Sequence, residues 1–186
     1  MRRLATALAA AGAAGAAVLA APAAALATPD AASAAASASA QEVWWTTRNW
    51  RSGKCLEQSW VNGVEQPDVK VAGCTGGDHQ QWAFTLVDSS YSIVTVKNKR
   101  SGKCLQQSWV NGVEQPDVKA AGCTGGSNQL WQIHQAQYQV TGYFLENESS
   151  GKLLQQRYVN GTEYPEVNVG TGGGFDYLNQ VWRSPR

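Results

Sequence analysis

The stretch from Ser52 to Gly77, SGKCLEQSWVNGVEQPDVKVAGCTGG, occurs almost unchanged a second time over 101–126 and more loosely a third time from Ser150 onward. The copies are spaced 49 residues apart, and each is followed by a Gln-x-Trp tripeptide. Self-similarity at a fixed period indicates a repeat architecture built from one supersecondary unit. The chain is therefore expected to offer up to three versions of one surface. The tripeptides contribute Gln80, Trp82, Gln129, Trp131, Gln180 and Trp182.

The hydrophobic pattern of the copies predicts β-strands. After the first Gln-x-Trp, Trp82, Phe84 and Leu86 alternate with polar or small residues, and this period of two is typical of a half-buried strand. Residues 91–98, YSIVTVKN, are rich in β-branched side chains and predict another strand. Asn-Gly pairs at 62–63, 111–112 and 160–161 predict tight hairpin turns. No stretch after residue 41 keeps a helical period, so the fold class is all-β.

A period near 50 residues fits two all-β architectures. A propeller blade has about this length, but a propeller needs at least about four blades and the chain has three copies. Three four-stranded units with pseudo-threefold symmetry form a β-trefoil. The sequence therefore predicts a β-trefoil over 42–186, with repeats at about 42–90, 91–139 and 140–186.

The N-terminal residues have the pattern of a secretory signal. Arg2 and Arg3 precede an apolar Ala/Val/Leu run that ends in small residues at Ala27. We expect cleavage after Ala27, with a second small-residue site before Gln41 as the alternative. The run is too weakly apolar to favour a membrane helix. Residues 1–27 are thus predicted to be a signal peptide, 28–41 a disordered Ala/Ser-rich linker, and the mature protein secreted.

The composition of the folded part limits its partners. Without Arg2 and Arg3 the chain has 13 basic and 14 acidic residues, so its surface is nearly neutral. Nucleic acids and anionic membranes need concentrated positive charge, so neither is expected as a partner. Some 145 residues are enough for one core, and we expect a monomer without cofactor or metal.

The four cysteines form two equivalent pairs. Cys55 and Cys74 are 19 residues apart, as are Cys104 and Cys123, whereas the third copy has lost both members of its pair. Four cysteines allow three connectivities, and this paired loss favours disulfides 55–74 and 104–123. A zinc site is the alternative, but no C-x-x-C or nearby Cys/His cluster supports it.

The complete pattern resembles the ricin B-type β-trefoil lectins, especially secreted actinobacterial ones. The resemblance rests on S-G-K-C-L, a second cysteine 19 residues on and Gln-x-Trp, repeated over about 42–186. It implies carbohydrate binding without catalysis, with the tripeptide Gln and Trp residues in architectural roles. Glycan or polysaccharide is thus the expected partner.

The resemblance also implies where sugars would bind. In the family, an Asp two residues after the first cysteine and an Asn before the motif Gln hold the hydroxyls, and an aromatic two residues before the second cysteine stacks on the ring. The Asp position here holds Glu57, Gln106 and Gln155; the Asn position holds His79, Asn128 and Asn179; and the aromatic position holds Ala72, Ala121 and Gly170. The usual site therefore lacks its stacking partner in every copy.

A different set of residues recurs in all three copies. An aromatic, an Asn-Gly turn, a glutamate and a second carboxylate keep their spacing even where the cysteines are gone. Such a set has the composition of a glycan platform, and we hypothesise a relocated sugar site in each repeat. Two alternatives stay open, namely that the motif only shapes the hairpin, or that sugars still bind at the Glu57, Gln106 and Gln155 positions. The relocated set comprises Trp60, Asn62, Glu65, Asp68, Trp109, Asn111, Glu114, Asp117, Tyr158, Asn160, Glu163 and Glu166.

Other functions have less support. His79, expected in a loop, and His134, expected on a polar strand face, have no catalytic motif around them. Repeated Glu65 and Asp68 pairs resemble a glycosidase carboxylate pair, but three active sites in one small domain would be unusual. The main alternative is a secreted protein-binding trefoil such as a protease inhibitor, favoured by the two-residue insertion near 174–178.

The disulfide pairing is directly testable. Non-reducing peptide mapping of the secreted protein should find the 55–74 and 104–123 bridges, because each pair closes a loop within one repeat. Closing loops of this length stabilises by roughly 3 kcal/mol in the chain-entropy model. Free thiols or a bridge between Cys55 and Cys104 would contradict both the pairing and the assignment of repeats.

Overall fold

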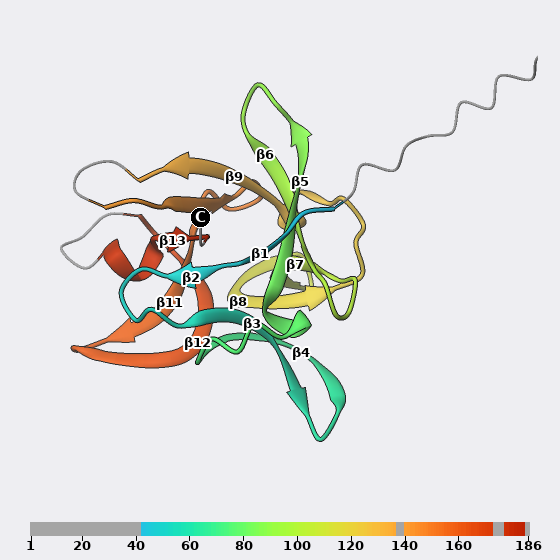
Figure 1. Ribbon diagram of the computed structural model, residues 1–186. Coiled ribbons are helices and arrows are strands. Elements are labelled where there is room, and N and C mark those ends of the chain that lie inside the picture. The colour runs from blue at the N-terminus through green and yellow to red at the C-terminus, as the bar shows by residue number, and fades with distance from the viewer. Residues whose placement is uncertain (1–41, 137–139, 173–176, 185–186) are drawn as a thin grey trace, which may run out of the picture. The chain divides into compact units, whose positions relative to one another are not determined.

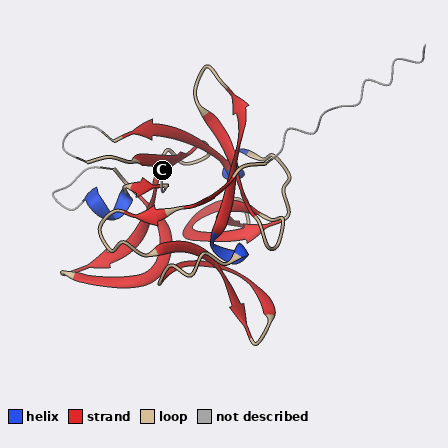
Figure 2. Cartoon of the chain, in the orientation of Figure 1, coloured by secondary structure: helices blue, strands red, loops and turns tan. Residues whose placement is uncertain are grey.

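The computed structural model describes residues 42–136, 140–172 and 177–184, and the folded unit spans Ala40–Arg186. The predicted signal segment and linker, residues 1–41, lie outside the described residues and remain predictions. The insertion near 174–178 also lies mostly outside them. The all-β fold class is confirmed, since strands dominate and the described helices are three short 3-10 turns (Figure 2).

The described residues form thirteen strands, which follow one another in three similar groups (Figure 1). The first group comprises β1 (Trp44–Thr46), β2 (Arg48–Asn49), β3 (Cys55–Val61), β4 (Val64–Ala72), η1 (Asp78–Gln80) and β5 (Gln81–Asp88). The second comprises β6 (Ile93–Asn98), β7 (Cys104–Val110), β8 (Val113–Ala121), η2 (Ser127–Gln129) and β9 (Leu130–Gln135). The third comprises β10 (Tyr143–Asn147), β11 (Leu153–Val159), β12 (Thr162–Gly170), η3 (Tyr177–Gln180) and β13 (Trp182–Arg183).

The pairing of these strands is that of a β-trefoil. The first and last strands of each repeat close a barrel in the order β1–β5–β6–β9–β10–β13–β2, with β1 and β2 acting as one interrupted strand. The two middle strands of each repeat form the hairpins β3–β4, β7–β8 and β11–β12. Strands β4, β8 and β12 pair with one another, so the three hairpins meet around the pseudo-threefold axis.

The core is built from equivalent residues of the three repeats. Trp82, Trp131 and Trp182 are fully buried, which confirms the prediction that the motif tryptophans face inward. Each indole Nε1 also donates a hydrogen bond of 2.9–3.0 Å to the backbone oxygen of a buried leucine in its own repeat. Since a buried indole N–H needs an acceptor, this bond fixes each hairpin to the barrel. The acceptors are Leu56, Leu105 and Leu154.

Both predicted disulfides are confirmed. Cys55 bonds to Cys74 and Cys104 to Cys123, each within its repeat. In the third repeat, Leu153 and Gly172 take the equivalent positions. A Cβ on Gly172 would lie 3.0 Å from the Leu153 Cδ1, so the leucine side chain occupies the space next to this glycine.

The buried face of β5 is shorter than the sequence predicts. Leu86 was expected to face inward with Trp82 and Phe84, but it is 57% exposed. The register of β5 and β6 shifts between Leu86 and Asp88, and the hairpin projects beyond the core at the top of Figure 1. The strand predicted over 91–98 also begins later than expected, because β6 starts at Ile93 and Tyr91 is exposed in the turn before it.

Removing a motif tryptophan should strongly destabilise the domain. Trp82→Ala is expected to lower the free energy of unfolding by about 3–5 kcal/mol, because it leaves a large cavity and removes the bond to Leu56. Urea unfolding monitored by far-UV circular dichroism would measure this. Trp45→Ala, at a tryptophan that is 40% exposed, is the matched control and should cost less than about 1 kcal/mol. Equal losses at both positions would contradict the assigned core.

Candidate functional site

The three hairpins hold the repeated turn motif in one geometry. In each, an asparagine and the following glycine have positive φ, near 50° and 80°, as a two-residue type I′ turn requires. The predicted site residues Asn62, Asn111 and Asn160 therefore form the turns. Strand register then places each aromatic directly opposite its own glutamate, and the pairs are Trp60 with Glu65, Trp109 with Glu114, and Tyr158 with Glu163.

Each glutamate of the motif has a basic partner from the next repeat around the axis. Lys103 Nζ lies 2.6 Å from Glu65, and Lys152 forms the equivalent ion pair with Glu114. In the third hairpin the partner is Arg51, whose Nε lies 4.0 Å from Glu163. The hydrogen bond and charge of Lys103 hold the pKa of Glu65 below its ordinary value of 4.5, assisted by a hydrogen bond from the amide of Gln58.

The aromatic rings differ in what covers them. The Arg100 guanidinium carbon lies 3.7 Å from the centre of the Trp60 ring. Arg51 lies at the same distance over Tyr158 and also donates a hydrogen bond of 2.5 Å to the Tyr158 hydroxyl. Trp60 and Tyr158 are consequently only part-exposed, whereas a glycan platform in every repeat requires three exposed aromatics.

Trp109 is the exposed aromatic of the three. It is 40% exposed and borders an open, shallow pocket of about 340 Å³ together with Ser127, Asn128 and Ser149. Asn128 comes from η2, where its Nδ2 donates a hydrogen bond to the backbone oxygen of Gln107. Ser149 comes from the turn between β10 and β11. The pocket therefore combines an accessible indole with two hydroxyls and one amide.

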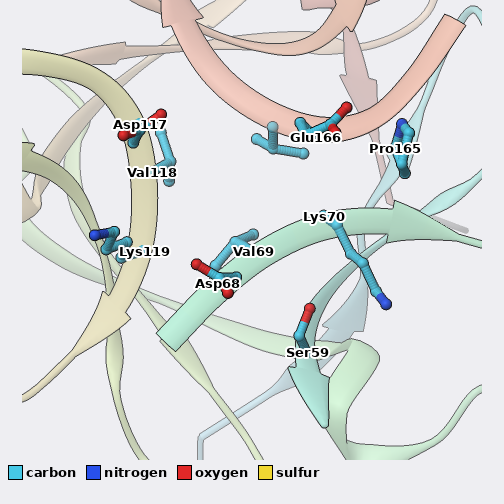
Figure 3. Close-up of a pocket in the computed structure, with 10 residues that line it drawn as sticks. Ser59, Asp68, Val69, Lys70, Asp117, Val118, Lys119, Pro165 and Glu166 are labelled. Carbon is cyan, nitrogen blue, oxygen red and sulfur yellow. The ribbon is translucent and has the colours of Figure 1, made fainter. Parts of the chain in front are cut away.

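The second carboxylate of the motif lies elsewhere. Asp68, Asp117 and Glu166 border a different hollow of about 440 Å³, located where β4, β8 and β12 meet (Figure 3). Asp68 pairs in register with Lys119 of another repeat and not with its own aromatic. The twelve residues predicted as one repeated site are therefore not together. The aromatics, asparagines and glutamates lie at the hairpins, whereas Asp68, Asp117 and Glu166 border the axial hollow.

A family model described as the ricin-type beta-trefoil lectin domain matches residues 43–163. The chain belongs to this family. The matched residues include the first two hairpins, strand β11 and the motif tryptophans Trp82 and Trp131. Sequence comparison with curated proteins finds no match to the chain.

Several solved structures share the fold of this ricin-type domain. The designed threefold-symmetric protein ThreeFoil is 24% identical with a TM-score of 0.61, over 76% of this chain and 96% of its own. A ricin B-like lectin of Macrolepiota procera, solved in complex with lactose, is 16% identical with a TM-score of 0.61, over 78% and 96%. An exo-beta-1,3-galactanase from Clostridium thermocellum is 22% identical with a TM-score of 0.59, over 76% of this chain and 29% of that enzyme. At these identities the likeness shows the fold alone.

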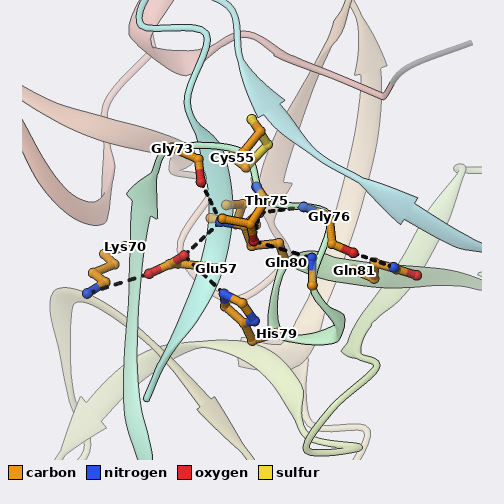
Figure 4. A network of polar contacts seen from close by, with 12 residues as sticks. Cys55, Glu57, Lys70, Gly73, Thr75, Gly76, His79, Gln80 and Gln81 are labelled. Atoms are coloured by element: carbon orange, nitrogen blue, oxygen red, sulfur yellow. Dashed lines mark hydrogen bonds and ion pairs between the residues drawn. A yellow bond between two sulfur atoms is a disulfide. The ribbon is translucent and has the colours of Figure 1, made fainter. Parts of the chain in front are cut away.

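The positions of the usual ricin-type sugar site serve internal contacts here. Glu57 is buried, accepts a hydrogen bond from Gln80 and lies 3.5 Å from both Lys70 and His79 (Figure 4). The glutamines equivalent to Glu57 likewise accept hydrogen bonds from the motif glutamines. These are Gln106, bonded by Gln129, and Gln155, bonded by Gln180.

The stacking position of the usual site holds a small, part-buried residue in each repeat. Ala72, Ala121 and Gly170 pair directly with the first residues of β3, β7 and β11. A Cβ on Gly170 would lie 2.5 Å from the Gln155 amide, so a larger side chain would not fit without a shift of that glutamine. Asn179 is also buried and donates its Nδ2 to the backbone oxygen of Gln156.

The two histidines have separate structural contacts. His79 was expected in a loop but lies in η1, with its Nε2 directed at Glu57. His134 lies on β9, with its Nε2 3.0 Å from Glu146 on the neighbouring strand β10. Among the described residues no cluster of three or more His, Cys, Asp or Glu side chains is arranged to hold a metal ion. In the same part of the chain no helix has the length and apolarity to span a membrane.

Sequence reasoning missed two sets of residues at the repeat junctions. Asn49, Asn98 and Asn147 are fully buried, and each donates its Nδ2 to a backbone oxygen of another repeat. Arg51 and Arg100 follow two residues later and cover the aromatics. Both sets recur at the 49-residue spacing immediately before the S-G-K stretch, and this recurrence is the signal in the sequence that marks them.

The Glu65–Lys103 pair should make stability depend on pH. Because the folded-state pKa of Glu65 is lowered, its contribution is present above about pH 4.5 and is lost as the pH falls through the folded-state pKa. Glu65→Gln should therefore cost about 0.5 kcal/mol at pH 7 and less at pH 3, as measured by urea unfolding. In a Lys103→Met background the difference in cost between the two pH values should become smaller, because only the Gln58 hydrogen bond then lowers the pKa of Glu65. An undiminished cost at pH 3 would contradict the ion pair.

Proposed function

We propose that this chain is a secreted, non-catalytic carbohydrate-binding module whose ligand stacks on Trp109. The observation that carries the proposal is the open indole of Trp109, set beside the hydroxyls of Ser127 and Ser149 and the amide of Asn128. A pyranose needs such a surface, because its C–H face packs on an aromatic ring while its hydroxyls need hydrogen-bonding partners.

The chemistry of the pocket favours a neutral sugar. All of its lining side chains are uncharged, and the nearby Glu114 is neutralised by Lys152. Asn128 is held by its bond to Gln107, so its amide is oriented before a ligand arrives. Pre-oriented polar groups cost less entropy when they bind, which favours their use as hydroxyl partners.

The residues that line the Trp109 pocket favour binding without catalysis. Hydrolysis of a glycosidic bond needs a pair of carboxyl groups flanking it, and none of the described residues that line the Trp109 pocket is an acid or a base. Family membership supports the ligand class, as does the fold shared with the lactose-bound Macrolepiota procera lectin. The predicted signal peptide and the two disulfides support an oxidising, extracellular location.

A protein ligand is the second candidate. Leu86, Val87 and Tyr91 are each more than half exposed around the β5–β6 turn, whereas Trp109 lies on β7. Exposed apolar groups of this kind occur at protein interaction sites. This candidate predicts that substitutions at the β5–β6 turn, and not at Trp109, weaken binding.

A glycan array followed by titration calorimetry on a glycan hit would test the proposal. Trp109→Ala should weaken binding about tenfold or more, because loss of the stacking surface removes about 1.4 kcal/mol. Trp45→Ala is the matched control, since Trp45 is also 40% exposed but lies on β1, and it should leave affinity unchanged. The melting temperature should fall by no more than a few degrees in both variants. Unchanged affinity in Trp109→Ala would contradict the proposed site. A glycan array without any binding signal, together with a protein partner, would favour a protein ligand.

A further inference from the structure

The turn before the hairpin of each repeat carries one position that differs between repeats in a chemically important way. The turns read Asn49-Trp50-Arg51-Ser52-Gly53, Asn98-Lys99-Arg100-Ser101-Gly102 and Asn147-Glu148-Ser149-Ser150-Gly151. Asparagine, serine and glycine are identical in all three. The middle residue is arginine in two turns and serine in the third.

The backbone of this turn is held in the same place in all three repeats. In each turn, the backbone N–H of the glycine donates a hydrogen bond of 2.8–2.9 Å to the backbone oxygen of the asparagine. The asparagine Nδ2 then bonds to another repeat, as Asn98 does to the oxygen of His79 and Asn147 to the oxygen of Asn128. The turn therefore lies beside the preceding hairpin whatever its middle residue is. Consistent with this, Ser149 borders the Trp109 pocket.

The middle residue decides whether the adjacent aromatic is free. A guanidinium carbon 3.7 Å from a ring centre is in van der Waals contact, so Arg100 and Arg51 occupy one face of Trp60 and Tyr158. A serine side chain is too short to cover an indole, and Trp109 is correspondingly exposed.

We infer that the Arg100 and Arg51 side chains act as plugs, meaning that each blocks an aromatic ring that could otherwise bind a ligand. We call the two blocked rings latent sites. The residue at this position of the turn then sets the number of open sites per chain. Trp60, Trp109 and Tyr158 supply three equivalent stacking surfaces, of which Trp109 alone is open because Ser149 replaces the arginine. That the ligand is a sugar rests on the proposed function. That the arginines block the two rings does not depend on which ligand binds.

The two plugs differ in strength. Arg51 adds a hydrogen bond to the Tyr158 hydroxyl and lies near Glu163, so the third hairpin is closed by several contacts. Arg100 is itself exposed and forms no ion pair within the described residues. Beneath it, Trp60 Nε1 is buried and has no acceptor among those residues, so the site retains an unused donor. Trp60 is thus the latent site that opens more easily.

Hydroxyl-radical footprinting with peptide mass spectrometry tests the plug without any ligand. In the full mature chain, Arg100→Ser should raise oxidation of Trp60 toward the level of Trp109, and Ser149→Arg should lower oxidation of Trp109 toward that of Trp60. Lys99→Ser removes the same charge from the neighbouring position and should change neither. Arginine already occupies this turn twice, so Ser149→Arg should keep the wild-type melting temperature. Unchanged oxidation of both tryptophans would overturn the inference.

Calorimetric titration with a glycan hit tests the consequence for binding. Ser149→Arg should weaken binding about tenfold, as loss of the stacking surface does. Arg100→Ser should add a second, weaker site, because Asp78 and His79 replace Ser127 and Asn128 there, and Trp60→Ala in that background should remove it. If footprinting responds but no variant binds glycan, the plug stands and the proposed function fails. If Ser149→Arg binds as tightly as wild type, the plug is overturned as a determinant of binding.

Discussion

The buried tryptophan of each Gln-x-Trp links the two layers of the trefoil. Its indole fills the core under one hairpin, and its N–H bonds to a leucine oxygen 26 to 28 residues earlier, on the first strand of that hairpin. The neighbouring glutamine closes the loop before it, as Gln80 does by donating to the Gly73 oxygen and accepting from the Thr75 N–H. Because buried polar groups are costly without partners, these few contacts fix the hairpin geometry on which every candidate site depends.

The third repeat illustrates which parts of the unit can be replaced. Its disulfide is gone, yet β11 and β12 keep the same register as the hairpins of the other repeats. Leu153 packs next to Gly172 where a bridge lies elsewhere, so packing replaces a covalent link. By contrast, Trp182 and Gln180 keep the contacts of their equivalents. Core packing and the motif hydrogen bonds, and not the disulfide, are therefore the common requirement of the three units.

Near-identical repeats need not have identical surfaces. The first two copies agree over almost all of the stretch from Ser52 to Gly77, but Trp60 is covered and Trp109 is not. Arg100, which covers Trp60, and Ser149, which leaves Trp109 open, each belong to the following repeat. A surface formed at a junction depends on two copies at once, so a single change at position 149 can open one site without altering the hairpin that carries it.

The sequence by itself determined the local and repeated features of this protein. Period-two strands, Asn-Gly turns and the buried motif tryptophans followed from short-range patterns, because each depends on residues within one copy. The disulfide pairing followed from a comparison of the copies, since the third has lost both cysteines. The candidate site was predicted only in part: the pairing of Trp109 with Glu114 follows from the hairpin, whereas the departure of Asp117 to the axial hollow does not. Only the tertiary structure decided which aromatic is open. That outcome depends on contacts such as Arg51 to Tyr158, which join residues 107 apart through closure of the barrel, and no pattern within one repeat encodes such a distance.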